Sequence, residues 1–298
     1  MMKDIKYFGL ILVLFLVLIT GCGKKDPDKQ LKDAIEKTEN AKSATVKFGL
    51  NYGIDMQGIS FGVSFTGEED VYKKNEDNVS AHGTYSMKTF GINQSTENYI
   101  VQKDGYLYTY FKDENGQWTY SKTEYKKDNE DNDYKGKVIK VLDSATKVKS
   151  EKSDKKGYKK LSVTLNIDDV LKCFNEIIPK DSLDEMSEQL DNISMKDVTF
   201  TVYIKDGYIS VIEIDLEDIL KKFTKDLGNE FGQIEPHGVF TISIYDYNNV
   251  SEIKVPDEII NNAKEEKMEF DEKDFMNFDV KDFIDFDKMN EFDTKVDF

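Results

Sequence analysis

The sequence predicts an α+β protein: a strongly curved antiparallel β-sheet, an unclosed half-barrel, covered on its concave side by a few amphipathic helices. Two observations predict this fold. Apolar residues occupy every second position in many segments, while other segments repeat them at helical spacing. Aspartate-glycine dipeptides also stand between neighbouring strand-like segments, which predicts tight hairpins and therefore antiparallel pairing.

The chain begins with two lysines, Lys3 and Lys6, followed by an apolar run at residues 7–19. A helix that spans a bilayer needs about 20 apolar residues, so this run is too short to cross comfortably. Its length is typical of the hydrophobic region of a signal peptide. We therefore interpret residues 1–21 as an export signal and not as a membrane helix.

A short motif follows this apolar run. Ile19, Thr20, Gly21 and Cys22 resemble the bacterial lipobox, in which small residues let a peptidase cleave and the cysteine thiol accepts diacylglycerol. The resemblance implies a lipoprotein with Cys22 as its lipidated (diacylglycerol and palmitate) mature N-terminus. Two or more acyl chains anchor a protein stably. We expect a lipid anchor on the extracytoplasmic face of the cell membrane, with residues 22–27 as a tether.

The composition excludes some classes of partner. The formal charge is −17 and no arginine occurs. Nucleic-acid binding needs a basic patch, and bidentate recognition of phosphate relies on arginine, so neither is expected. The one cysteine besides Cys22 is Cys173, which lies beside an apolar helical stripe, and we interpret it as a small buried thiol.

The first half of the domain contains one helix and a series of strands. Asp26-Pro27 predicts a helix start, and helical spacing of apolar residues predicts a helix over 28–41. Alternation predicts a strand in "TVKFGLNYGI". Further strands are expected at about 58–66, 68–74, 78–88, 95–103, 105–111 and 117–121, with an Asp104-Gly105 hairpin.

The second half mixes the two patterns. "KVIKVLDSATKV" predicts a helix, "GYKKLSVTLNI" a strand, and residues 168–191 a helix that breaks at Pro179. Two strands flank the Asp206-Gly207 hairpin. A short helix from Leu216 to Phe223 and the strand "GVFTISIYDY" follow, before the segment "SEIKVPDEIINNAKEE".

Residues 264–298 differ in kind from the domain at 28–263. They are acidic and repeat phenylalanine roughly every eight residues, at Phe270, Phe278 and Phe286. No pattern of branched aliphatic residues supports a packed core there, so disorder in isolation is the expected state. A weakly amphipathic helix is the alternative, and the rings could then pack on a protein partner or on the domain itself.

We find no catalytic motif and predict no enzyme, no cofactor and no metal. The two histidines, His82 and His237, have no patterned partners. Residues 129–140 begin like a calcium loop, but Tyr134 stands where glycine is required and Lys140 where glutamate is required. We therefore name no catalytic residue.

The strands beside Asp206-Gly207 are rich in aromatic and aliphatic residues. We expect their inward faces either to pack as ordinary core beneath the helices or to line an apolar groove for acyl chains. The residues alone favour the core interpretation. The candidates for a ligand cavity are Phe200, Val202 and Ile204 on one strand and Tyr208, Ile212 and Ile214 on the next.

The order of these elements resembles the LolA/LppX-like lipoprotein superfamily over about residues 28–263. A lipobox and tether precede the helix "LKDAIEKTENAKS", and "MKDVTFTVYIKDGYISVIEIDL" and "YDYNNVSEIKVPDEI" are similar to the closing strands of Gram-positive members of unknown function. The resemblance implies a half-barrel with a hydrophobic cavity that holds lipid or acyl chains, and no catalytic residues.

Two functions are therefore expected. The first is a lipid-anchored protein that binds a hydrophobic small molecule or lipid without catalysis. The alternative is a lipid-anchored scaffold that binds an envelope or membrane protein, with residues 264–298 as the docking segment.

Overall fold

One β-sheet organises the part of the chain that the structure describes. The computed structural model describes residues 26–56, 59–75, 78–89, 92–113, 115–125, 139–174, 195–223 and 234–266. Its strands are β1 (Ser43–Met56), β2 (Ile59–Asn75), β3 (Asn78–Thr89), β4 (Ile92–Lys103), β5 (Tyr106–Lys112), β6 (Trp118–Glu124), β7 (Lys147–Glu151), β8 (Lys159–Asn166), β9 (Asp197–Lys205), β10 (Tyr208–Asp215), β11 (Ile234–Tyr245) and β12 (Lys264–Glu265).

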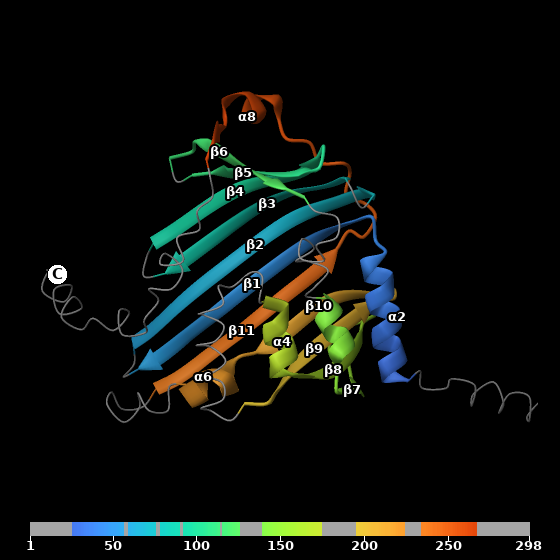
Figure 1. The fold of residues 1–298 in the computed structure, drawn as a ribbon. Helices are drawn as coiled ribbons and strands as arrows, with labels where there is room; N and C mark the ends of the chain where they lie inside the picture. Colours follow the sequence, from blue (N-terminus) through green and yellow to red (C-terminus); the bar gives the residue numbers. More distant parts are fainter. Residues whose placement is uncertain are drawn as a thin grey trace, which may run out of the picture.

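The strands form two meanders joined in the middle of a twelve-stranded sheet, in the order β12-β6-β5-β4-β3-β2-β1-β11-β10-β9-β8-β7. All described pairs are antiparallel except β12, which runs parallel to β6. The join is the long antiparallel pairing of β1 with β11, from Thr45 opposite Tyr245 to Met56 opposite Ile234. The predicted fold class is confirmed: the sheet is curved and its edge strands β12 and β7 do not meet (Figure 1).

The helices are short, and most lie on one side of this sheet. They are α2 (Pro27–Glu39), the 3₁₀ helix η2 (Val141–Ser144), α4 (Ile167–Phe174), α6 (Glu217–Phe223) and α8 (Asp257–Asn262). Figure 1 shows α2, α4 and α6 in front of the strands, on the concave face, and α8 above β6. Within the described ranges, no helix is both long and apolar enough to span a membrane.

Helix α2 begins and ends as its sequence predicts. The Asp26 carboxylate accepts a hydrogen bond from the backbone N–H of Asp28 at 3.2 Å, and Pro27 occupies the first turn, where its missing N–H costs nothing. The helix ends at Asn40, whose backbone N–H donates to the carbonyl of Glu36. One face of α2 is buried by Leu31, Ala34 and Ile35.

The hydrophobic core lies between α2, η2 and the inward side chains of β8 to β11. The most deeply buried residues come from η2 and from strands β8 to β10, and those on β8 alternate along the strand, as the period of two requires. Full burial of their side chains contributes about 1.5–3 kcal/mol each. This set comprises Leu142, Leu161, Val163, Leu165, Val202, Ile209 and Ile212.

Both predicted hairpins are confirmed by their backbone angles. Asp104 and Gly105 have φ values of 54° and 79°, and Asp206 and Gly207 have 52° and 83°. A two-residue turn of this type requires positive φ at both positions, which aspartate tolerates and glycine adopts freely.

The structure differs from the predicted elements in two places. The strands expected at 58–66 and 68–74 are one strand, β2, because Gly67 stays extended and pairs with Phe48 on one side and Tyr85 on the other. In the described part of "KVIKVLDSATKV", residues 139–140 are α-helical as expected, and the 3₁₀ helix η2 follows them. Helix α4 covers the start of the helix predicted at 168–191, and the remainder from residue 175 lies outside the described residues.

Candidate functional site

The predicted cavity residues of β9 lie in the core. The exposed fractions of Phe200, Val202 and Ile204 are 4%, 0% and 4%. On β10, Ile212 is 1% exposed, and Ile214 is half-buried against the same core. The structure therefore brings these five residues together, as part of the cluster that also contains the buried face of α2.

Tyr208 does not share their face, which corrects the prediction from alternation. It pairs with Lys205, whereas Ile204 pairs with Ile209 and Val202 with Ile212. The register shifts between Ile209 and Val211, and this bulge adds one residue to β10. Because paired residues share a face, Tyr208 lies on the face of Lys205 and not on that of Ile204 and Ile209.

Tyr208 instead belongs to a cluster at the hairpin. Its ring stacks on Tyr247 at 4.2 Å, and the Lys37 ammonium of α2 lies 4.1 Å from its centroid. Lys37 also donates to the carbonyl oxygen of Asp206 at 2.7 Å. These contacts fasten the C-terminal turn of α2 to the β9–β10 hairpin.

The same concave face continues beyond the core onto β1 to β6; we call the inward side chains of these six strands the distal half. Its centre is aromatic. Phe48 lies 5.4 Å from Phe65 and 5.7 Å from Tyr85, measured between ring centroids. Phe65 stays 37% exposed, a large apolar side chain that the described fold leaves partly uncovered.

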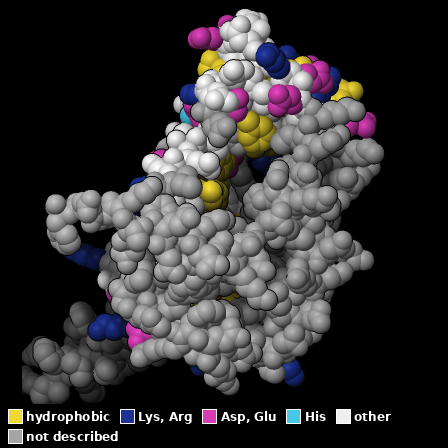
Figure 2. Space-filling view, turned by 90° about the vertical axis from the view of Figure 1, so that its left-hand side faces the viewer, with side chains coloured by type: hydrophobic (Ala, Val, Ile, Leu, Met, Phe, Trp, Pro, Cys, Tyr) yellow, Lys and Arg dark blue, Asp and Glu magenta, His cyan; other side chains and the backbone are white. Residues whose placement is uncertain are grey.

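A space-filling view gives the types of side chain on one side of the molecule. Figure 2 shows hydrophobic side chains among polar ones on the described part of this side of the molecule. Concave surfaces lined by aromatic and aliphatic groups are the usual form of small-molecule sites.

Two glycines let these rings lie flat on the sheet. A Cβ at Gly67 would stand 2.2 Å from Cζ of Phe48 and 2.7 Å from Cδ1 of Tyr85. A Cβ at Gly83 would stand 2.7 Å from the hydroxyl oxygen of Tyr85 and 2.9 Å from Oδ1 of Asn98. All four distances are shorter than a Cβ atom allows, so a side chain at either position would displace the aromatic or amide groups that cover it.

A polar trio adjoins the aromatic cluster: Glu69, Tyr85 and Asn98. Gly83 pairs with Glu69 on one side and with Asn98 on the other, so the trio surrounds this glycine. Glu69 is 5% exposed and Asn98 is 6% exposed. The Tyr85 hydroxyl donates a hydrogen bond to Oε2 of Glu69 at 3.2 Å.

The environment of Tyr85 keeps its phenol protonated. Burial raises the pKa of Tyr85 well above its ordinary 10.0, and the negative charge of Glu69 raises it further. A hydrogen bond from Asn98 opposes this rise in part. Tyr85 is therefore a donor to Glu69 across the physiological pH range.

Sequence reasoning missed this trio because β2 was divided in two. Continuous alternation from Val63 through Phe65 and Gly67 places Glu69 on the inward face, where a carboxylate is unusual. That inward acid was the available signal. Asn98 carries no comparable signal, because its burial depends on pairing between β3 and β4.

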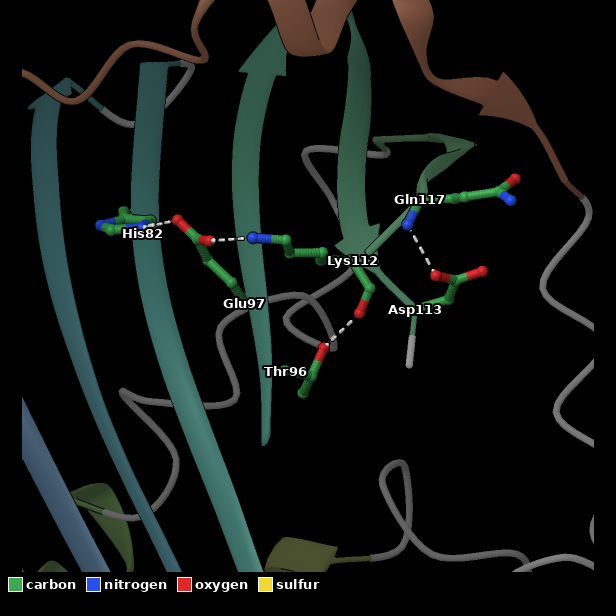
Figure 3. Close-up of polar contacts among 6 residues, drawn as sticks. All are labelled: His82, Thr96, Glu97, Lys112, Asp113 and Gln117. Atoms are coloured by element: carbon green, nitrogen blue, oxygen red, sulfur yellow. Dashed lines mark hydrogen bonds and ion pairs between the residues drawn. The ribbon is translucent and has the colours of Figure 1, made fainter. Parts of the chain in front are cut away.

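The outer face of the same strands carries a second polar cluster (Figure 3). A ring nitrogen of His82, Nε2, lies 2.9 Å from Oε1 of Glu97, and the Lys112 ammonium lies 3.5 Å from the other carboxylate oxygen. The His82 ring stacks on Tyr99 at 4.3 Å. The cluster links β3, β4 and β5, and the hydrogen bond from His82 lowers the pKa of Glu97 below its usual 4.5.

The remaining predictions concern His237, metal binding and segments that lie mostly outside the described residues. Nδ1 of His237 lies 3.7 Å from an exposed Asp55 carboxylate. In the described residues, no group of three or more His, Cys, Asp or Glu side chains could hold a metal ion. Cys22 with its lipobox, most of the loop 129–140 and residues 267–298 lie outside the described residues. Residues 264–266 do belong to the fold: β12 pairs with β6.

Comparison with protein families identifies the chain. The model of a family of unknown function, DUF6612, matches residues 27–264. The chain belongs to this family. No curated protein matches its sequence.

Two solved structures are similar to it. One is LprF from Mycobacterium bovis, with 15% identity, a TM-score of 0.44, and coverage of 77% of this chain and 96% of that one. The other is a DUF1329 family protein from Desulfovibrio piger, with 10% identity, a TM-score of 0.24, and coverage of 76% and 96%. At these TM-scores, neither neighbour says what this family member binds.

Replacing Gly67 by alanine should displace the aromatic cluster. The new Cβ overlaps the Phe48 ring, so the free energy of unfolding should fall by about 1–3 kcal/mol, as for overpacked cores. Urea denaturation measures this. Gly49→Ala is the control, because a Cβ there meets nothing closer than 3.9 Å and should change stability by less than about 0.5 kcal/mol. Equal effects of the two substitutions would refute the packing argument.

The stability contributed by Glu97 should depend on pH. Its pKa is lower in the folded state, so its stabilisation is complete above the unfolded value near 4.5 and is lost as pH falls through the folded value. The free energy of unfolding of the wild type should exceed that of Glu97→Gln by about 1 kcal/mol at pH 6, and by less at pH 3. Urea denaturation across this range tests it; a difference that grows on acidification contradicts it.

Proposed function

We propose that this protein is a lipid-anchored, extracytoplasmic binding protein that holds a hydrophobic ligand, a lipid or acyl chain, on the concave face between sheet and helices, without catalysis. We further propose that the family falls within the LolA/LppX-like lipoprotein superfamily and that this chain comes from a Gram-positive envelope.

The observation that carries the proposal is the aromatic cluster of the distal half. Phe48, Phe65 and Tyr85 form a continuous apolar surface on the concave face, next to the core. Large apolar surfaces that stay partly exposed commonly mark binding sites. The described α2 and η2 pack on the other half of the sheet, so Phe65 remains available to a ligand.

The predicted anchor supports the location. A lipidated Cys22 would place the domain beside the bilayer after a tether of residues 22–27, which suits a protein that exchanges acyl chains with a membrane.

Replacing Cys22 by serine should release the protein from the membrane. The hydroxyl of serine cannot form the thioether, so the protein expressed in a bacterial host should leave the detergent-rich phase in a detergent partition and appear in the aqueous phase or as uncleaved precursor. Cys173→Ser is the matched control and should stay in the detergent phase. Partition of both variants to the same phase would refute lipidation at Cys22.

The ligand proposal predicts acyl-chain molecules in the protein purified from its host. Solvent extraction and mass spectrometry should detect them at near-stoichiometric amounts. The exposed 37% of Phe65 corresponds to about 70 Å², whose burial by a ligand contributes ~2 kcal/mol. Phe65→Ser should therefore weaken binding of the neutral apolar probe N-phenyl-1-naphthylamine by roughly 20-fold, measured by fluorescence.

Val239→Ser is the control for this substitution. Val239 is 40% exposed on β11, and its partner Asn51 lies on the outer face. It should leave probe affinity unchanged. Equal losses at Phe65 and Val239, or ligand-free protein in repeated preparations, would refute the concave face as the site.

A further inference from the structure

We propose that Glu69, Tyr85 and Asn98 form the head-group site of an amphiphilic ligand, and that they select a head group that donates hydrogen bonds and carries no negative charge. This inference rests on the proposed function, because it assigns the polar end of the ligand whose apolar end lies on the aromatic cluster.

The hydrogen bonds inside the trio have a definite direction. The Tyr85 hydroxyl gives its proton to Glu69, so its oxygen accepts the hydrogen bond that comes from Asn98. The donor on Asn98 must be its amide nitrogen, which orients the amide. Its oxygen, Oδ1, then has no partner among the described residues. Bulk water does not replace that partner, because Asn98 is only 6% exposed.

An unpaired, buried carbonyl oxygen is costly and rare in folded proteins. A ligand that donates a hydrogen bond to Oδ1 would remove this cost. Tyr85 has one O–H, which Glu69 already receives. The atom of the trio without a partner among the described residues is therefore an acceptor, Oδ1 of Asn98, and the head group that complements this atom is a donor such as a hydroxyl or an ammonium.

Charge selects in the same direction. Glu69 is 5% exposed, and the negative charge through which it raises the pKa of Tyr85 repels anions more strongly in this low-dielectric site than it would in water. A carboxylate or phosphate head group would face this repulsion and would leave Oδ1 of Asn98 unpaired. Sugar hydroxyls and primary ammonium groups are not repelled by Glu69, and they can donate a hydrogen bond to Oδ1 of Asn98.

Tyr85 connects the two ends of the proposed ligand site. Its ring lies 5.7 Å from Phe48, and its hydroxyl oxygen lies 3.2 Å from Glu69. Gly83, which pairs with both Glu69 and Asn98, leaves the space above the sheet that these polar atoms occupy. An acyl chain on Phe48 and Phe65 would thus place its head group at the trio.

The outer-face cluster of His82, Glu97 and Lys112 on the same strands is a polar network with a structural role. Both oxygens of the Glu97 carboxylate are paired, one with His82 and one with Lys112. Asn98 is the next residue along β4 and faces the opposite way, and its amide oxygen has no partner in the part of the chain that the structure describes. The difference distinguishes a network that ties strands together from one that has an acceptor left for a ligand.

The test uses the full-length chain, stripped of bound lipid, and four amphiphiles with one decyl chain: decyl glucoside, decylammonium, decyltrimethylammonium and decanoate. Isothermal titration calorimetry below their micelle concentrations measures each affinity. Decyl glucoside, decylammonium or both should bind about 10-fold or more tightly than decanoate. Decyltrimethylammonium, which has the charge but no N–H, should bind more weakly than decylammonium.

The first two probes distinguish the two sources of a donor head group. A preference for decyl glucoside indicates a glycolipid, and a preference for decylammonium indicates an amino head group; both support the inference. Equal affinities for all four probes, or tightest binding of decanoate, overturn it while the apolar site stands. No binding of any probe overturns the proposed function as well.

Variants separate recognition from folding. Asn98→Leu should lower affinity for the preferred probe by about 10-fold and leave decanoate unchanged. Asn98→Asp should raise the affinity for decylammonium and lower the affinity for decanoate. A misfolded protein cannot produce these opposite changes. Glu69→Gln should reduce the difference in affinity between decylammonium and decanoate.

Glu68→Gln is the matched control for Glu69→Gln. Glu68 is the preceding residue of β2, lies on the outer face and pairs with Lys47 at 3.5 Å. It should leave all four affinities unchanged. If Glu68→Gln and Glu69→Gln have the same effect, general charge and not the trio sets the selectivity, and the inference fails.

Discussion

The packing of α2 on β7 to β10 is the interaction on which the rest of the structure depends. A long sheet that is apolar on one face must cover that face, and α2 with η2 supplies a close-packed cover for one half of it. The cover is tied down by polar contacts as well: the Thr38 hydroxyl accepts a hydrogen bond from the backbone N–H of Ile209 at 3.0 Å. Because α2 precedes β1 directly, this packing also positions the strand at which the two meanders join.

The distal half solves the same problem by a different means. Aromatic rings lie across Gly67 and Gly83 and cover backbone that helices cover elsewhere. This cover leaves Phe65 partly exposed, and the amide oxygen of Asn98 has no partner among the described residues. A buried polar atom without a partner costs free energy that an aliphatic side chain would avoid. These two features are the reason why we place the proposed ligand on the distal half.

The two faces of β4 illustrate how one strand can serve two purposes. Glu97 points outward into a paired cluster, and Asn98 points inward to the trio. Alternation places neighbouring residues on opposite faces, so a carboxylate in a paired outer cluster and a buried amide of the inward trio can be adjacent in sequence.

Local chemistry in the sequence determined the elements: the Asp26 cap and Pro27 start α2, Asp-Gly pairs close the hairpins, and alternation identifies the strands and their inward faces. These features act over a few residues, so they can be read without the fold. Tertiary structure alone decided the rest. The bulge that turns Tyr208 away and the continuity of β2 through Gly67 depend on neighbouring strands. The meeting of Glu69, Tyr85 and Asn98 likewise depends on the register of β2, β3 and β4, because hydrogen bonds between strands distant in sequence set which side chains become neighbours.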